Sequence, residues 1–521
     1  YWRALSFEPV ETVLGTSEIS LGSRLHSSDE IEDGVNPYWV WGGNAGRVYF
    51  ALSWCGGWRA QLKPVGGEPA ALGCQIFLPP EETQLTLRPR ESITGPVLHV
   101  FLTRETHERE SRAAWMRERA ALGRILYGGP DAWYPFTYNN WYTTRFDVTE
   151  AFLQRQLDAL DPFGFDVFIV DAGWYAAVGQ WDPDPAKYSP GAFERILTAI
   201  REKGIMTGIW SCPQFVKADA DALPPEADQP PFYRKFIDAY LLDYAGMDFT
   251  RHLLDHVQAL RDRYGAGWWK YDQDFFVPQT RHGVAKNVVA LQDALLAVRR
   301  THPDLYMENC QSGGRMINEF TVLMTQNQWI RDGGGTGPVH ARSNLSEALG
   351  ALEFMPPWTV NRWTNNPDRN DPKDDEFTKR YCRSAMAGTW GLVADLPKIT
   401  DRQRAVIVRE AGHYRRLNAL KTDCRYDVLR AERTAKAAGM IYYDAAGRRA
   451  GVLLLRWMAR DAFTFPVQMD GMAPNAIYRL EDVDLGEIRE IPGNVLCREG
   501  LEIAFHTQRQ SALVFVESVG Q

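Results

Sequence analysis

The chain is 521 residues long, which excludes a single small module and corresponds to about three to four domains of ordinary size. Apolar residues make up 45% and charged residues 24% of the sequence, and no window approaches the roughly 20 consecutive apolar residues that a membrane-spanning helix needs. The 66 acidic and 58 basic side chains leave a net charge of −8, which argues against a nucleic-acid partner.

Cysteine and aromatic usage adds two further indications. The seven cysteines are sparse and never in C-x-x-C spacing, which argues against a zinc ribbon or a disulfide scaffold and favours a reducing compartment. No basic-then-apolar leader is visible in the sequence, so the cytoplasm is the favoured location, although the compartment stays open. The 18 Trp, 21 Tyr and 24 Phe exceed what a core requires, and such rings suit sugar faces as well as protein interiors.

Residues 1–110 predict an N-terminal antiparallel β domain. Apolar and polar residues alternate with period two in short runs that Gly and Pro separate. The expected strands are Val48–Ser53, Trp58–Leu62, Gly73–Leu78, Gln84–Leu87 and Val97–Leu102. From Glu105 to Leu126 the sequence is rich in Arg, Glu and Ala, which predicts a helical linker, assigned to residues 111–130.

Residues 131–418 alternate short apolar strands with amphipathic helices. The expected strands are Phe136–Trp141, Val167–Asp171, Met206–Trp210, Trp268–Asp272, Leu305–Glu308, Gln328–Arg331, Pro357–Val360 and Gly391–Ala394. The expected helices are Thr149–Leu160, Phe193–Lys203, Thr250–Tyr264, Ala285–Arg300 and Asp401–Leu417. Such a series of units predicts an α/β fold, a (β/α)8 TIM barrel, with a doubly wound sheet as the competing architecture.

Two segments complete the domain assignment. The proline-rich stretch 218–232 follows the third predicted strand, where we expect a lid or a subsite wall. Residues 419–521 return to short strands and predict a C-terminal β-sandwich. Its expected strands are Met440–Tyr443, Gly451–Arg456, Ala476–Leu480, Glu502–Phe505 and Ala512–Val516.

Several polar side chains fall at the C-terminal ends of the predicted barrel strands, where barrel enzymes carry their chemistry. They are Trp141, Asp171, Trp210, Asp272, Glu308 with Asn309 and Cys310, and Asp332. Carboxylates at neighbouring strand ends can form the acid and nucleophile pair of a retaining glycosidase.

The segment Trp268–Asp272 is the clearest of these. Residues two apart in a strand face the same side, so Lys270 and Asp272 both point into the barrel mouth, with Asp274 beyond them if the strand continues. The ammonium of Lys270 favours the ionised carboxylate that a nucleophile needs, whereas Asp274 acts in the opposite direction. A purely structural Lys–Asp pair explains the same residues equally well.

Asp332 is exposed at a predicted strand tip by the glycines 333–335 that follow it. A partly desolvated aspartic acid at this place can hold its proton and act as a general acid. The competing interpretation is a turn residue, because aspartate before glycine is common in turns.

Six short motifs occur in the order found in glycoside hydrolase family 36, which the predicted barrel resembles. The motifs are Asp171–Trp174, Gly179–Lys187, Lys270–Asp272, Glu308–Arg315, Trp329–Asp332 and Gly388–Lys398. That family contains α-galactosidases, α-N-acetylgalactosaminidases and the plant raffinose and stachyose synthases. Each motif is weak alone, but six in the same order are specific.

The resemblance implies a role for the matched residues. Asp272 would be the nucleophile and Asp332 the acid/base of a double displacement. The implied substrate-binding residues are Trp210 as the platform under the sugar, Asp171 and Lys270 at its hydroxyls, and Cys310 with Gly313 near the 2-substituent. Further candidates for substrate binding are Trp141, Asp274 and Arg315.

The chain also departs from the pattern of that family. Ala172 replaces the second of two aspartates that usually precede Gly-Trp, and this carboxylate helps to hold the hydroxyls that distinguish a galactoside. The run Trp210–Gln214 lacks two acids, and Asp274 replaces an asparagine. The glycine run at Gly313 is one residue shorter than usual. The resemblance therefore implies retained chemistry and leaves the recognised sugar open.

We expect an exo-acting retaining α-glycosidase that resembles α-galactosidases and takes a small carbohydrate substrate. A raffinose-synthase-like transglycosylase, an N-acetylgalactosaminidase and a carbohydrate-binding protein without turnover are the alternatives. No metal or organic cofactor is expected, because protonation and carboxylate attack suffice. His252 and His256 have the spacing of a zinc pair, but a solvated helix face is the favoured interpretation.

Overall fold

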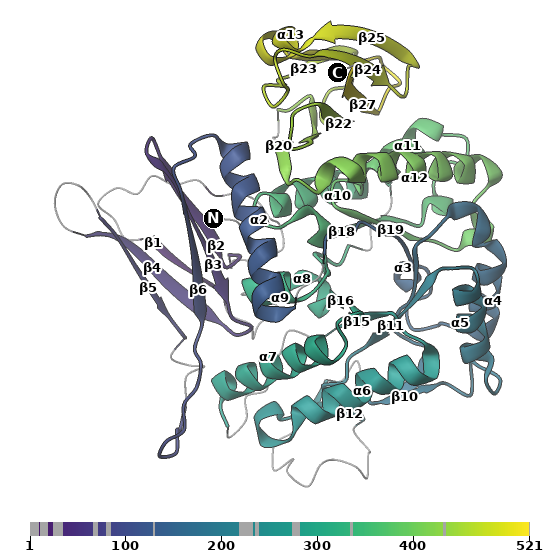
Figure 1. The fold of residues 1–521 in the computed structure, drawn as a ribbon. Coiled ribbons are helices and arrows are strands. Elements are labelled where there is room, and N and C mark those ends of the chain that lie inside the picture. Colours follow the sequence, from purple (N-terminus) through teal and green to yellow (C-terminus); the bar gives the residue numbers. More distant parts are fainter. Residues whose placement is uncertain are drawn as a thin grey trace.

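Three parts follow one another along the chain and pack side by side in the computed structural model (Figure 1). The structure describes residues 10, 19–23, 35–65, 71–79, 85–128, 131–217, 233–234, 239–272, 282–333, 337–430 and 434–519. No helix within these ranges combines the length and the apolar character required to cross a bilayer.

The N-terminal part consists of two three-stranded antiparallel sheets, with strand orders β1-β4-β5 and β2-β3-β6. The strands are β1 (Ile19–Ser23), β2 (Tyr38–Gly43), β3 (Gly46–Ser53), β4 (Trp58–Val65), β5 (Ala71–Phe77) and β6 (Val97–Thr103). The antiparallel prediction is confirmed, but residues 85–87 of the predicted strand Gln84–Leu87 form none, because no neighbouring strand pairs with them.

Helix α2 (Glu108–Tyr127) joins these sheets to the next part. Its Trp115 stacks on Tyr49 of β3, and Tyr38 of β2 packs against Phe354 with ring centroids 4.6 Å apart. The buried Arg119 donates to both carboxylate oxygens of Glu319 and to the carbonyl of Phe354. The N-terminal part is therefore anchored to the barrel by a shared apolar core and by a buried ion pair.

The central part is a closed barrel of eight parallel strands in the order β7-β8-β11-β15-β16-β17-β18-β19. The strands are β7 (Phe136–Asn139), β8 (Val167–Val170), β11 (Met206–Ser211), β15 (Trp268–Tyr271), β16 (Tyr306–Asn309), β17 (Asn327–Trp329), β18 (Val360–Asn365) and β19 (Thr389–Val393). The predicted TIM barrel is confirmed. The strand expected at Pro357–Val360 lies later, because residues 357–359 form a 3-10 turn and β18 begins at Val360.

Helices surround the barrel, and caps in the sequence define several of their ends. The helices that follow the strands are α4 (Glu150–Ala159), α5 (Ala192–Glu202), α6 (Phe249–Tyr264), α7 (Val284–Thr301), α9 (Glu319–Met324), α10 (Gly337–Leu352), α11 (Asp375–Ser384) and α12 (Asp401–Lys421). The hydroxyl of Thr149 accepts from the amide of Phe152, as expected of an N-cap. Short strands β9 (Tyr175–Ala177), β10 (Gln180–Pro183), β12 (Phe215–Lys217), β13 (Tyr233–Arg234) and β14 (Ala239–Leu241) lie in the loops.

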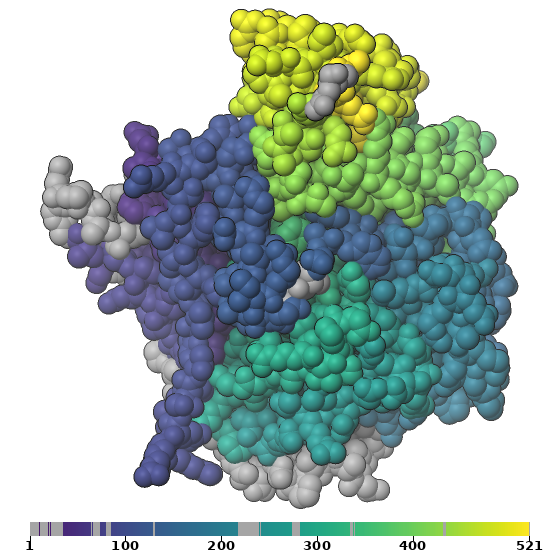
Figure 2. Space-filling model, in the orientation of Figure 1, coloured from purple at the N-terminus to yellow at the C-terminus, as the bar shows by residue number. Residues whose placement is uncertain are grey.

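The C-terminal part contains a six-stranded antiparallel sheet of order β20-β21-β22-β27-β24-β25 and a two-stranded sheet β23-β26. Its elements are β20 (Arg425–Leu429), β21 (Ala437–Tyr443), β22 (Arg449–Arg456), β23 (Phe463–Val467), β24 (Ile477–Asp482), β25 (Glu487–Pro492), α13 (Gly493–Glu499), β26 (Leu501–Phe505) and β27 (Ser511–Ser518). It has an apolar core of its own and rests on the segment that contains α11 and α12 (Figure 2).

Candidate active site

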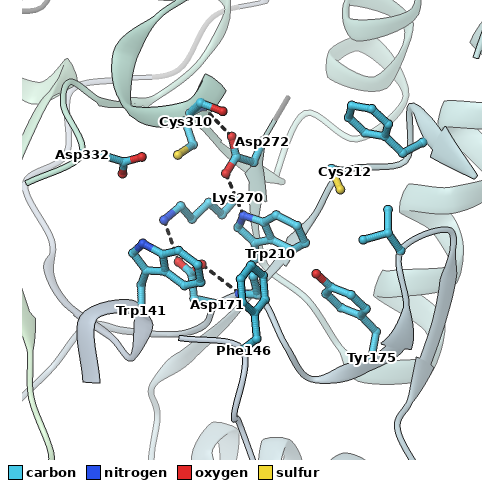
Figure 3. A pocket seen from close by; sticks show the side chains of 14 residues that line it. Trp141, Phe146, Asp171, Tyr175, Trp210, Cys212, Lys270, Asp272, Cys310 and Asp332 are labelled. Carbon is cyan, nitrogen blue, oxygen red and sulfur yellow. Dashed lines mark hydrogen bonds and ion pairs between the residues drawn. The ribbon is translucent and has the colours of Figure 1, made fainter. Parts of the chain in front are cut away.

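A cavity of about 210 Å³ opens at the C-terminal ends of the barrel strands (Figure 3). Its lining residues are Trp141, Phe146, Asp171, Ala172, Tyr175, Val178, Trp210, Cys212, Phe215, Lys270, Asp272, Cys310, Ser312 and Asp332. The lining combines four charged side chains with apolar and aromatic groups, which is typical of a small-ligand site.

The structure brings seven of the candidate residues to this cavity. They are Trp141, Asp171, Trp210, Lys270, Asp272, Cys310 and Asp332. Gly313 lies directly behind Asp332, whereas Arg315 is not among the lining residues. Asp274 and the proline-rich stretch 218–232 lie outside the described residues.

The carboxylate of Asp272 is held by two N–H groups that approach its two oxygens. The indole Nε1 of Trp210 donates to Oδ2 at 3.0 Å, and the backbone amide of Ser312 donates to Oδ1 at 2.7 Å. The side-chain amide of Gln214 also donates to the carbonyl oxygen of Asp272 at 2.7 Å. These contacts fix both the backbone and the carboxylate, and donors of this kind stabilise negative charge.

Asp332 lies on the opposite side of the cavity from Trp210, after strand β17 (Figure 3). Its Oδ1 accepts from the indole Nε1 of Trp329 at 2.9 Å and from the hydroxyl of Tyr142 at 3.4 Å. The residue is exposed, so the partial desolvation expected from the sequence is not observed. The side chain thus stands where it contacts both solvent and the cavity.

Lys270 and Asp171 form a buried ion pair at the floor of the cavity. The Nζ of Lys270 lies 2.6 Å from Oδ2 of Asp171, and both side chains are 2% exposed. Asn139 donates to the same oxygen at 2.7 Å. Burial opposes the charged ammonium, but the carboxylate of Asp171 outweighs it and raises the pKa of Lys270.

Glu308 lies beside Lys270, fully buried and not among the residues that line the cavity. Its Oε1 is 3.9 Å from the Nζ of Lys270, and its Oε2 accepts from the indole of Trp268 at 3.1 Å. Burial raises the pKa of Glu308 to about 7, although the nearby ammonium acts in the opposite direction. Glu308 therefore supports Lys270 from behind and does not line the pocket.

The motifs that resemble family 36 contact one another in space. The indole of Trp174 donates to the carbonyl of Trp210 at 3.0 Å. The Nζ of Lys187 donates to the carbonyls of Phe146 and Gly173, each at 2.7 Å. Gly173 has a φ of +102°, and a Cβ there would lie 2.4 Å from the backbone of Phe146. These contacts position the loop that carries Phe146 at the pocket mouth.

Sequence reasoning missed the apolar part of the lining. Phe146, Tyr175, Val178 and Phe215 come from loops after three different strands, and none carried a local signal of function. Tyr175 stacks on Trp210 with ring centroids 5.6 Å apart, so one face of the predicted sugar platform is already covered. Only the spatial arrangement shows that these side chains converge.

The interpretation of the histidine pair as a solvated helix face is wrong. The Nε2 of His252 is 2.7 Å from the carbonyl of Pro213, and the Nε2 of His256 is 2.8 Å from the hydroxyl of Ser211. Both rings therefore face the loop after β11. Within the described part of the chain, no three His, Cys, Asp or Glu side chains gather in a way that could hold a metal ion.

Comparison with known proteins relates this geometry to a family. The melibiase family model matches residues 129–422, more than half of the chain. The bifunctional alpha-galactosidase/sucrose kinase AgaSK of Mediterraneibacter gnavus is 22% identical over 400 residues, which cover 73% of this chain and 41% of that protein. The chain spans about half the length of the curated relatives it matches.

Solved structures share the fold. The alpha-galactosidase from Lactobacillus brevis superposes with a TM-score of 0.81 at 17% identity, covering 98% of this chain and 71% of that chain. A variant of the alpha-galactosidase AgaA from Geobacillus stearothermophilus, in complex with raffinose, has a TM-score of 0.76 at 16% identity and covers 97% of this chain and 72% of that chain. The barrel and its flanking antiparallel sheets are therefore an arrangement that these proteins share.

Proposed function

The chain belongs to the melibiase family, and from this premise we propose that it is a retaining α-glycoside hydrolase that acts on α-galactosides. The observation that carries the proposal is that Asp272 and Asp332 line one small pocket from different sides, with the Lys270–Asp171 pair at its floor. Relatives are named as α-galactosidases, and one was solved with raffinose; we extend that substrate class to this chain.

The proposed reaction is a double displacement. Asp272 attacks the anomeric carbon while Asp332 protonates the glycosidic oxygen, which breaks the bond to the leaving group and forms a glycosyl ester on Asp272. Asp332, now a carboxylate, then takes a proton from water as the water attacks the same carbon and releases the sugar. Two inversions at one carbon give net retention.

The surroundings of the two carboxylates support this division of roles. Asp272 is fixed by the N–H groups of Trp210 and Ser312, which suits a group that must stay anionic and aligned with the carbon. Asp332 is exposed beside the cavity, where a leaving group departs and water enters. Lys270 and Asp171 offer a donor and an acceptor for ring hydroxyls.

Replacement of each carboxylate tests the proposal. We expect Asp272→Ala to abolish turnover of every α-galactoside. Asp332→Ala should lower turnover by about 10²- to 10⁴-fold for substrates with poor leaving groups and much less for activated aryl substrates, because only the former need the proton. Azide should restore turnover of aryl substrates by Asp332→Ala through formation of a glycosyl azide, and proton NMR should show retained anomeric configuration.

Asp255→Ala is the matched control, because Asp255 is an exposed aspartate on the outside of α6. Its activity should equal that of the unmodified chain. Turnover by Asp272→Ala at the unmodified rate would remove the assigned nucleophile. A product of inverted configuration would exclude the double displacement whatever the two variants do.

A further inference from the structure

The proposed sugar pocket has two unlike walls. Its charged side chains are Asp171, Lys270, Asp272 and Asp332, and a mostly apolar wall is formed by five residues from the loops after β8 and β11: Ala172, Tyr175, Val178, Cys212 and Phe215. The rest of the lining is Trp141, Phe146, Trp210, Cys310 and Ser312. Two residues of this wall, Tyr175 and Cys212, lie on the side of the cavity away from Asp332 (Figure 3). The two walls therefore meet different parts of any sugar that is bound between them.

The positions of the catalytic carboxylates fix how the sugar ring must lie. The anomeric carbon has to sit between Asp272 and Asp332 for attack and protonation. In a pyranose ring carbon 4 lies opposite the anomeric carbon and carbons 3 and 5 flank it, so this edge of a bound ring would point away from Asp332, toward the side on which Tyr175 and Cys212 lie (Figure 3). The substituent on carbon 5 extends furthest from the ring, so it is the group that reaches this wall.

The apolar wall offers few partners for a hydroxyl at that place. Ala172 is 2% exposed, and its side chain ends at a methyl group; Val178, Cys212 and Phe215 are 8%, 6% and 1% exposed. Among the described lining residues, the phenol of Tyr175 and the thiol of Cys212 are the polar side-chain groups of this wall, which contains no carboxylate and no ammonium group. Burial raises the pKa of Tyr175 well above its ordinary value.

We propose, on the basis of the function proposed above, that the pocket selects α-glycosides of galactose configuration in which carbon 5 bears a methyl group or hydrogen instead of a hydroxymethyl group. A primary hydroxyl facing this wall would lose its water without gaining a charged acceptor from the described wall residues, which is costly for a buried polar group. A methyl group at the same place would bury apolar surface against Ala172 and Val178. In the function proposed above, the Lys270–Asp171 pair binds the ring hydroxyls, so the ring configuration remains specified.

Competition among three aryl glycosides tests this selectivity on the unmodified chain. The substrates are a nitrophenyl α-D-galactopyranoside, its 6-deoxy analogue (an α-D-fucopyranoside) and the pentose analogue (a β-L-arabinopyranoside), which share one leaving group and one ring configuration. We expect kcat/KM for the 6-deoxy substrate to exceed that for the galactoside by about 10- to 100-fold. Equal or higher kcat/KM for the galactoside overturns the inference and leaves the hydrolase proposal standing.

Binding measurements separate the two proposals if turnover is absent. Calorimetry with free D-fucose and D-galactose reports on the apolar wall without requiring catalysis. Tighter binding of D-fucose supports the inference, and equal or tighter binding of D-galactose overturns it. Failure to hydrolyse all three aryl substrates, with D-fucose bound more tightly, would refute only the proposed hydrolysis.

Ala172→Asp places a carboxylate at the apolar wall. It should raise the ratio of galactoside to 6-deoxy kcat/KM by at least about tenfold, because the primary hydroxyl gains an acceptor. Ala172→Val is the matched control, since it adds bulk without polarity and should not shift the ratio toward the galactoside. A folded Ala172→Asp protein with an unchanged ratio contradicts the inference; if it does not fold, the sugar-binding comparison above decides.

Discussion

At the scale of single residues, Gly313 determines where the proposed acid/base lies. Its φ is +79°, and a Cβ at this position would lie 2.3 Å from the amide nitrogen and 2.7 Å from the Cβ of Asp332. The adjacent Gly314 approaches the carbonyl of Ile330 in the same way. The loop after β16 and the segment after β17 can therefore touch only because neither glycine has a side chain.

This contact predicts the effect of Gly313→Ala. The added methyl group should displace Asp332, and a displacement of about 1 Å can cost about 100-fold in rate. We expect kcat to fall strongly for substrates with poor leaving groups and weakly for activated aryl substrates, because proton donation is the affected step. The measurement is the ratio of the two kcat values.

Gly204→Ala controls for backbone strain. Gly204 also has a positive φ, +78°, but a Cβ there would meet nothing within 4 Å. This variant should lose stability through strain and keep the unmodified ratio of kcat values. The same ratio in both variants would mean that Gly313 has no role in positioning Asp332.

At the scale of elements, the barrel strands could be predicted where the pattern of apolar residues in the sequence matches the burial of the side chains. Strands β8, β11 and β15 begin at the residues predicted from the sequence. β18 was misplaced because all six of its residues are buried, including Arg362 and two asparagines, so it shows neither alternation nor an apolar run. Helices α10 and α11 were not predicted, and α11 carries buried Lys379, Arg380 and Arg383 that obscure its apolar face.

The sequence predicts only part of the candidate site, because only some of the lining residues belong to local motifs. Motifs of adjacent residues, such as those that contain Asp272 and Asp332, could be recognised because each lies on one strand end. The apolar wall could not be recognised, because Val178 and Phe215 meet only after separate loops fold onto the barrel. Whether the assigned residues act as proposed remains a prediction that the variants test.

The contact between helices α2 and α9 predicts how much one buried ion pair contributes to the stability of the fold. Arg119 and Glu319 are 3% and 0% exposed, and their ion pair joins the helix after the N-terminal sheets to the barrel. Arg119→Met should lower the free energy of unfolding by about 3–5 kcal/mol, because Glu319 is left as an uncompensated buried charge. Chemical denaturation checks this value.

A second substitution separates the charge from the packing. Arg119→Met combined with Glu319→Leu should recover most of the loss, since a buried pair replaced by apolar groups is often neutral. Arg117→Met, at an exposed position of the same helix, is the control and should change stability little. Equal losses of unfolding free energy in the single and double variants would show that the packing of Arg119, and not the uncompensated charge of Glu319, determines the loss of stability.

At the scale of the whole molecule, a buried ionic cluster ties the C-terminal sheets to the barrel. Arg383 of α11 donates to both carboxylate oxygens of Asp484, at 2.7 and 2.9 Å, and to Glu410 of α12. The Nζ of Lys379 lies 3.0 Å from the same aspartate. Burial opposes the charged carboxylate, but Arg383 and Lys379 outweigh it and lower the pKa of Asp484 below its ordinary value.

The lowered pKa predicts how stability depends on pH. The ionised Asp484 stabilises the folded chain fully at pH values above its ordinary pKa of about 4, and this contribution is lost as the pH falls through the lowered value. Asp484→Asn should therefore cost about 3 kcal/mol at pH 7, and its deficit should shrink in acid. Urea denaturation between pH 3 and pH 7 measures the difference.

Asp461→Asn serves as the comparison, because Asp461 is exposed in the same C-terminal part. It should show neither the loss at pH 7 nor a change of that loss in acid. A deficit of Asp484→Asn that stays constant down to pH 3 would contradict the assigned role of its ionisation.

The apolar and the charged lining residues of the pocket come from different parts of the barrel. Ala172, Val178 and Phe215 follow β8 and β11, whereas Asp272 and Asp332 follow β15 and β17. Trp210 and Gln214, which hold Asp272, belong to β11 and its loop, so selection experiments would have to spare them. Variation confined to positions 172, 178 and 215 would accordingly be expected to exchange one glycone for another while both proposed catalytic carboxylates keep their contacts.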